Sequence, residues 1–176
     1  MRTALFAVAA TLAAAGPAAA ALSVGAKAPD FETTGAIAGK AFHLHLADQL
    51  KKGPVVLYFF PKAFTAGCTA EAHAFSDAAK DFKKAGARVI GMSADDVPTL
   101  QKFSVEECRN SFPVASATPE VIKGYDVSMP LAGKLVNLTN RTSYVIARDG
   151  KIAMVHSEMS WKDHVAKSLA AVQALH

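Results

Sequence analysis

The sequence predicts an α/β layer fold whose sheet is parallel at its centre and antiparallel at one edge. Two observations predict it. Strand-like and helix-like segments alternate along the chain, and Asp149-Gly150 separates two strand-like runs near its end, which is a strong hairpin signal. The 176 residues, 51% of them hydrophobic and 19% charged, suit one globular domain.

The first half of the chain is expected to hold a buried strand followed by a helix. Residues 55–60 form a continuous apolar run between Gly53-Pro54 and Pro61, as in a strand buried on both faces. A helix is expected over residues 69–85, with Gly86 after its end. Its apolar residues recur at helical spacing: Phe75, Ala78, Ala79 and Phe82.

The second half repeats the alternation and then changes to a hairpin. A strand is expected at 88–93 and a short one at 113–115. Between them a helix capped by Asp95 or Asp96, with Pro98 in its first turn, should run to about Cys108. A short helix follows at 119–125 and the hairpin strands at 143–147 and 151–156. Ser160 and Asp163 have capping-box spacing, so a last helix should run from there to about Leu175.

The first 21 residues have the layout of a secretory signal peptide. Met1-Arg2 gives a positive start, residues 5–15 are apolar, Gly16-Pro17 breaks the run, and small residues fill 18–21. Cleavage is expected near Ala20 or Ala21, which leaves residues 22–176 as one exported domain. The apolar run is short for a membrane span, and an uncleaved N-terminal helix is the alternative reading.

The charge and histidine patterns give little support for nucleic-acid binding or for a metal site. The formal charge of +4 is spread along the chain without a Lys/Arg block, so nucleic-acid binding gains little support. His43 and His45 share one face of an expected strand, but two histidines alone make a poor metal site. Cys68 and Cys108 fit a structural staple, a redox pair, or a reactive thiol with a bystander.

Cys68 is placed where chemistry is favoured. A buried strand ends, a turn follows, and Cys68 stands at the start of a helix, at the sheet edge where open α/β folds build their sites. Free helix N–H groups and the positive end of the helix dipole stabilise a thiolate, which is the nucleophilic form. The alternative is that Cys68 is a small buried hydrophobic residue.

Pro61, Thr65 and Cys68 reproduce a P-x-x-x-T-x-x-C motif, and here the chain resembles the peroxiredoxins. Phe60-Pro61-Lys62-Ala63, Gly67-Cys68-Thr69 and Glu71-Ala72 are similar to the bacterioferritin comigratory protein (PrxQ) branch. The resemblance continues through residues 24–31, 90–95, 124–127 and 141–146. It implies a thioredoxin-like fold, a mixed central sheet flanked by helices.

The resemblance also implies a role for each site residue. Cys68 would be the peroxidatic cysteine, which attacks a hydroperoxide and becomes a sulfenic acid. Thr65 would hold the thiolate and the peroxide, and Pro61 would shape the pocket and shield the thiolate. Arg141 would stabilise the thiolate and the leaving oxygen, because its cation is permanent and its donors are fixed. Glu71 would pair with an arginine or favour the helix N-terminus.

The chain departs from the branch at the second cysteine. Many members carry it five residues after the first, where this chain has His73. Other members place it in the helix after the next strand, nearer Ser104 than Cys108. Eleven helical residues span about 16 Å, so a Cys68–Cys108 bond, which needs Cα atoms within about 7 Å, would require local unfolding. Cys108 is expected to resolve Cys68; a buried bystander and an intermolecular partner are the alternatives.

The function expected from the resemblance is reduction of hydrogen peroxide and alkyl hydroperoxides in the periplasm. Electrons would come from a thioredoxin-like thiol donor, with no metal, haem or flavin and with no membrane or nucleic-acid partner. A thiol–disulfide oxidoreductase is a weak alternative, because the chain has no C-x-x-C pair. The other alternative is an exported thioredoxin-fold protein with a structural Cys68–Cys108 disulfide and no peroxidase turnover.

Overall fold

The computed structural model describes residues 21–131 and 134–175, and they form the α/β layer fold that the sequence predicts. The main sheet has seven strands in the order β2-β1-β5-β4-β3-β8-β9. The pairs β3–β4 and β4–β5 are parallel, and the pairs on both flanks are antiparallel. Both edges of the sheet are therefore antiparallel, whereas the sequence indicated only the one at the hairpin. The strands are β1 (Glu32–Ile37), β2 (Lys40–His45), β3 (Val55–Phe59), β4 (Arg88–Ser93), β5 (Val114–Ser116), β8 (Thr142–Ile146) and β9 (Ile152–Ser157), with β6 (Ser128–Leu131) and β7 (Lys134–Thr139) as a separate pair.

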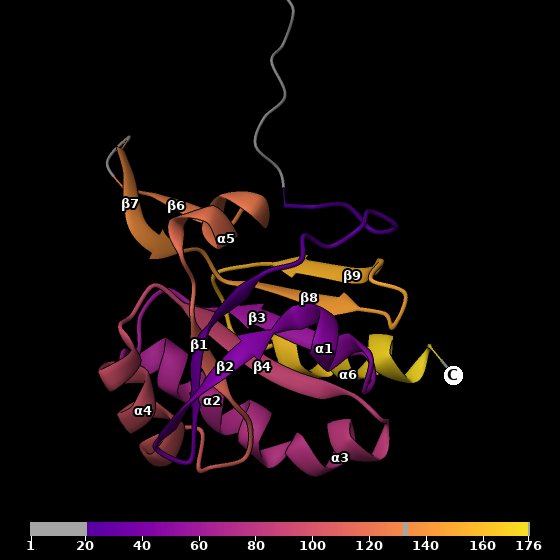
Figure 1. Ribbon diagram of the computed structural model, residues 1–176, viewed down its shortest axis with the longest axis horizontal. Coiled ribbons are helices and arrows are strands. Elements are labelled where there is room, and N and C mark those ends of the chain that lie inside the picture. The colour runs from indigo at the N-terminus through magenta and orange to yellow at the C-terminus, as the bar shows by residue number, and fades with distance from the viewer. Residues whose placement is uncertain (1–20, 132–133, 176) are drawn as a thin grey trace, which may run out of the picture.

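Helices and loops cover both faces of this sheet, as Figure 1 shows. The helices are α1 (Leu46–Leu50), α2 (Ala66–Asp77), α3 (Ala79–Lys84), α4 (Val97–Glu106), α5 (Pro119–Gly124) and α6 (His164–Gln173). β3 is buried on both faces: Leu57 and Phe59 belong to the core under α1 and α5, whereas Val56 and Tyr58 belong to the core under α2, α3, α4 and α6. The apolar run at 55–60 thus contains β3, an interior strand of the sheet next to β4. Among the described residues no helix is long and apolar enough to cross a membrane.

The expected helix at 69–85 is two helices, and it begins earlier than expected. α2 begins at Ala66 and ends at Asp77, and α3 follows after Ala78, whose φ of −85° and ψ of −1° bend the chain. The bend allows both Phe75 and Phe82 to be buried in one core. Periodicity alone did not reveal this break, because alanine is compatible with either conformation.

Two other helix boundaries were predicted wrongly. α4 ends at Glu106, and Cys108 lies in the turn that closes it, with its N–H donating to the Phe103 carbonyl. α6 begins at His164, and its N-cap Asp163 makes no side-chain cap bond. The segment before α6 is instead held to β8, since the Glu158 N–H donates to the carbonyl of Arg141.

Candidate active site

The loop after β3 delivers Cys68 to the first turn of α2. β3 ends at Phe59, and Thr65 is the extended N-cap of α2, so Cys68 is the third helical residue. Its side chain is buried, with 2% of its surface exposed. The N–H groups of a first helical turn have no intrahelical acceptor, and with the helix dipole they favour an anion such as a thiolate. The fold thus places Cys68 where the sequence predicted it.

Strand register brings Arg141 to Cys68. Thr142, the first residue of β8, pairs with Phe59, the last of β3, so the residue before β8 lies beside the loop that leads to α2. Nη2 of Arg141 donates to Sγ of Cys68 at 3.5 Å. A Cβ at Gly67 would lie 3.3 Å from this same nitrogen, so glycine leaves room for the guanidinium.

The guanidinium is anchored on its other sides as well. Nη1 of Arg141 donates to Oε2 of Glu71, and Nε donates to the Met159 carbonyl at 2.9 Å. Glu71 stands one turn after Cys68 on α2, and its side chain is fully buried. Burial raises the pKa of Glu71 to about 8, against the opposing effect of Arg141. Arg141 is therefore a fixed, buried cation between a thiol and a carboxyl group.

The loop between β3 and α2 is held by hydrogen bonds from β4. Oδ2 of Asp95 accepts the N–H of Ala63 at 2.7 Å and the hydroxyl of Ser93 at 2.8 Å. Phe64 takes a φ of 63°, which is unusual for a residue with a side chain and marks a strained turn. Such a fixed loop keeps the first turn of α2 in place.

The two remaining residues of the predicted motif lie in the same loop. Pro61 is half-buried just after β3. Thr65 is exposed, and its hydroxyl donates to the Lys62 carbonyl at 2.9 Å rather than to Cys68. Its oxygen can still accept a hydrogen bond. The structure thus joins Cys68, Glu71 and Arg141 directly and places Pro61 and Thr65 at the rim.

Comparison with known proteins agrees with this geometry. Residues 24–155, most of the chain, match the AhpC/TSA family. The chain belongs to the AhpC/TSA family of peroxiredoxins. Peroxiredoxin Q of Oryza sativa subsp. japonica is 33% identical over 155 residues, which cover 88% of this chain and 68% of the rice protein. The enzyme is therefore a thiol peroxidase, and the resemblance seen in its sequence is confirmed.

Solved structures place this peroxiredoxin in the same group. The crystal structure of the peroxidoxin BcpB from Mycobacterium tuberculosis matches with a TM-score of 0.77 and 37% identity, over 87% of this chain and 97% of that one. The Xanthomonas campestris bacterioferritin comigratory protein, studied for its alkyl peroxide reduction activity, matches with a TM-score of 0.70 and 27% identity, over 81% and 90%. The thioredoxin-like fold of the domain is thereby confirmed.

Both cysteines of the peroxiredoxin are free and buried in one core cluster. Burial raises the pKa of the Cys108 thiol, with a smaller contribution from the neighbouring Glu107. Cys108 is thus a neutral thiol inside the folded domain. Arg109 and Asn110, which follow it, both take positive φ, of 49° and 58°. This closing turn is conformationally costly for residues with side chains.

Sequence reasoning missed three residues of the site: Asp95 as a loop anchor, Ser143 and His164. Asp95 carried a usable signal, because polar residues just after a central parallel strand mark the functional edge of a sheet. Ser143 and His164 carried none, since each is an ordinary residue whose contact appears only when β8 and α6 pack together. His164 is fully buried, and its Nδ1 lies 3.7 Å from Oε1 of Glu71.

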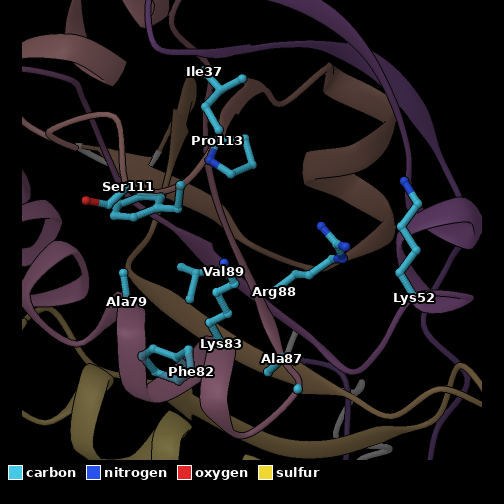
Figure 2. A pocket seen from close by; sticks show the side chains of 12 residues that line it. Ile37, Lys52, Ala79, Phe82, Lys83, Ala87, Arg88, Val89, Ser111 and Pro113 are labelled. Carbon is cyan, nitrogen blue, oxygen red and sulfur yellow. The ribbon is translucent and has the colours of Figure 1, made fainter.

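A cavity of about 330 Å³ lies at the other end of the parallel strands (Figure 2). It opens beside Arg88, the first residue of β4, and is also lined by Lys52, Lys83, Phe82 and Val89. Cys68 and Arg141 do not line it. In the described residues no group of three or more His, Cys, Asp or Glu side chains could hold a metal ion.

Proposed function

We propose that Cys68 is the peroxidatic cysteine and that this enzyme reduces hydrogen peroxide and alkyl hydroperoxides. The observation that carries the proposal is the 3.5 Å contact between Arg141 and Sγ of Cys68 at the N-terminus of α2. A buried, fixed cation and free helix N–H groups stabilise the thiolate before substrate arrives. The reported alkyl peroxide reduction by the Xanthomonas relative supports the same substrate class.

The chemical step transfers two electrons from sulfur to the peroxide. The Cys68 thiolate attacks the terminal oxygen, an S–O bond forms, the O–O bond breaks, and the leaving oxygen takes a proton to become water or an alcohol. Arg141 stabilises the charge that builds on that oxygen. The Thr65 hydroxyl, which already donates to Lys62, accepts the O–H of the hydroperoxide, and Pro61 shields the thiolate from solvent.

Cys108 then resolves the sulfenic acid. Its thiol attacks the sulfur of Cys68–SOH, a disulfide forms and water leaves. Since both cysteines are buried, the turn at Cys108, the first turn of α2, or both must open locally. A dithiol donor of the thioredoxin type then reduces the disulfide. The competing reading is a permanent Cys68–Cys108 staple in a protein without turnover.

We also propose that the enzyme works outside the cytoplasm, in the periplasm. The support is the signal-peptide layout of residues 1–21, of which residues 1–20 lie outside the described part of the chain.

Stopped-flow mixing of the reduced protein with hydrogen peroxide tests the mechanism, with Cys68→Ser and Cys108→Ser alongside. We expect oxidation at least 10³-fold faster than for free cysteine, on the order of a typical catalytic electrostatic contribution, lost in Cys68→Ser alone. A 68–108 disulfide should then form in the wild type, whereas Cys108→Ser should stop at the sulfenic acid. Oxidation no faster than that of free cysteine would refute the peroxidase proposal in favour of the staple.

A further inference from the structure

Behind the Cys68–Arg141 pair lies a buried carboxyl oxygen without a hydrogen-bond partner. Oε2 of Glu71 accepts from Arg141, but Oε1 is buried and has no hydrogen bond among the described residues. Leaving an ionised oxygen buried and unsatisfied is costly. The group that lies 3.7 Å from Oε1 is Nδ1 of His164.

The tautomer of His164 follows from its two hydrogen bonds. Nε2 lies 2.9 Å from the Glu158 carbonyl oxygen, which can only accept, so Nε2 carries the proton. Nδ1 lies 2.8 Å from the Ser143 hydroxyl. Burial lowers the pKa of His164 to about 4, so the ring is neutral at neutral pH. Nδ1 is then an acceptor facing Oε1, another acceptor, and only a proton on the carboxyl group makes that contact favourable.

The charges around Glu71 lead to the same conclusion. Arg141 is the buried cation that contacts both Glu71 and Cys68. If both acids were ionised, two buried negative charges would share one positive charge. With a proton on Glu71, the thiolate and the guanidinium balance each other.

The other titratable groups near this cluster do not supply a second cation. Tyr58 of β3 is fully buried, and its pKa is raised well above its usual value, chiefly by burial, so the phenol is neutral. His156 of β9 packs against His164 in a tilted arrangement with ring centroids 4.5 Å apart, and its pKa is lowered, chiefly by burial. Lys167 of α6 is exposed and lies 3.3 Å from Nδ1 of His156.

We propose that Glu71 keeps a proton on Oε1 while Cys68 is a thiolate, and that His164 is the positioning residue that receives this proton's hydrogen bond at Nδ1. The reactive state is therefore Cys68–S⁻ with Glu71–COOH: the S–H bond of Cys68 breaks, its proton goes to solvent, and Glu71 stays protonated. The Ser143 hydroxyl donates to Nδ1 while Glu71 is ionised and rotates away when Glu71 is protonated. This inference rests on the proposed function, since it concerns how the peroxidatic thiolate is stabilised.

The pH dependence of the reaction with hydrogen peroxide tests it, measured from about pH 5 to about pH 10. In the wild type we expect a rate constant that rises as Cys68 ionises and falls near pH 8, where Glu71 ionises and competes for Arg141. Glu71→Gln should abolish the fall, because its amide stays neutral.

His164→Gln isolates the positioning role. The glutamine amide can still donate to the Glu158 carbonyl but removes the acceptor at Nδ1. The protonated form of Glu71 loses its hydrogen bond, so the fall should move to lower pH by about one unit. His156→Gln is the matched control: it changes a histidine that packs against His164 but has no hydrogen bond or ion pair with Glu71, and the profile should not change.

A second readout does not depend on activity. Infrared difference spectra of the wild type, with Glu71→Gln as reference, should show the carbonyl band of a protonated carboxylic acid at neutral pH. The absence of that band would overturn the inference, and so would a His164→Gln profile that superimposes on the wild type. Failure of the proposed function can be told apart from failure of this inference. In that case Cys68 would react no faster than free cysteine, while the infrared band of protonated Glu71 would still be present.

Discussion

Arg141 serves three partners with one side chain, and a lysine could not. Its nitrogens reach Cys68, Glu71 and the Met159 carbonyl together. Lysine carries the charge as a point and lacks the planar fork. We expect Arg141→Lys to lower the rate constant with hydrogen peroxide by about 10²-fold, which stopped-flow kinetics will measure. Arg148→Lys, at an exposed arginine that donates to the Lys51 carbonyl, is the control and should react like the wild type. An Arg141→Lys variant with the wild-type rate would show that charge alone suffices.

The buried His164 makes a separate prediction about acid stability. Its folded pKa of about 4 lies below the unfolded value of 6.5, so the unfolded chain binds more protons between these values. Stability is therefore complete above pH 6.5 and is lost as the pH falls toward 4, by on the order of 3 kcal/mol. Urea unfolding across this range should show the loss, and His164→Gln should flatten it. His43→Gln, at an exposed histidine, should leave the slope as it is. An equal slope in His164→Gln would assign the acid sensitivity to other groups.

Site residues that lie close together in the sequence could be predicted, and those brought together only by folding could not. Cys68, Pro61 and Thr65 stand within eight residues of each other, so one motif contained them. Arg141 was found only through the family resemblance. No residue near it in the sequence indicates the pairing of β3 with β8 that brings it to Cys68. His164 was missed entirely, since its contact with Glu71 joins residues of two helices far apart in the chain.

Among the elements, the strong strands, the hairpin, the start of α4 and the short helix α5 were predicted, whereas the break between α2 and α3, the end of α4 and the start of α6 were not. The hairpin follows from Asp149-Gly150, where Gly150 takes a φ of 82° that glycine tolerates best. The end of α4 depends on packing: Cys108 is fully buried and the chain turns there through positive φ at Arg109 and Asn110. Asn110 tolerates positive φ, but Arg109 is not a usual helix stop, so the predicted helix ran on to Cys108.

Two ion pairs join the turn that contains Cys108 to α2. Nε2 of His73 lies 2.7 Å from a carboxyl oxygen of Glu107, and Arg109 donates to Asp77 at 2.9 Å. The Arg109–Asp77 pair is exposed and the His73–Glu107 pair is half-buried, and each contributes on the order of 0.2–1 kcal/mol. The His73→Ala/Asp77→Ala double variant should therefore open the turn more often and form the 68–108 disulfide about 3- to 10-fold faster, if opening limits that step.

Rapid quenching and disulfide mapping after one equivalent of peroxide will measure this rate. Lys80→Ala on the exposed surface of α3 is the control and should not change it. An unchanged rate in the double variant would mean that the opening that limits the reaction occurs elsewhere, at the first turn of α2.

At the scale of the whole molecule, the sequence predicted a parallel centre but not the strand order. β1 and β2 extend the sheet on the β5 side, whereas β8 and β9 extend it on the β3 side. This order joins strands that are far apart in the chain, and no short segment of sequence indicates it. Its consequence is functional, because only this order sets the start of β8 beside the end of β3.

Hydrogen bonds between residues 22–28 and the β8–β9 region predict where the folded domain must begin. Cleavage after Ala21 would leave Leu22 first, and its backbone nitrogen donates to the Tyr144 hydroxyl at 3.2 Å. Three further backbone bonds tie this segment to the hairpin: Gly25 donates to Ile152 at 2.8 Å, Ala28 donates to Gly150 at 2.9 Å, and Ile152 donates to Ala26 at 2.9 Å. Residues 22–176 should therefore unfold in urea at the same concentration as the full chain.

A chain that begins at residue 29 loses these four hydrogen bonds and should be less stable by about 2–6 kcal/mol, since each contributes about 0.5–1.5 kcal/mol. Mass spectrometry of the exported protein gives the matching readout in the cell. An N-terminus at Ala21 or Leu22 fits both the signal peptide and the packing, because it retains every one of these bonds. An N-terminus beyond Ala28 would contradict both, since the exported domain would then lack the segment that closes its core against the hairpin.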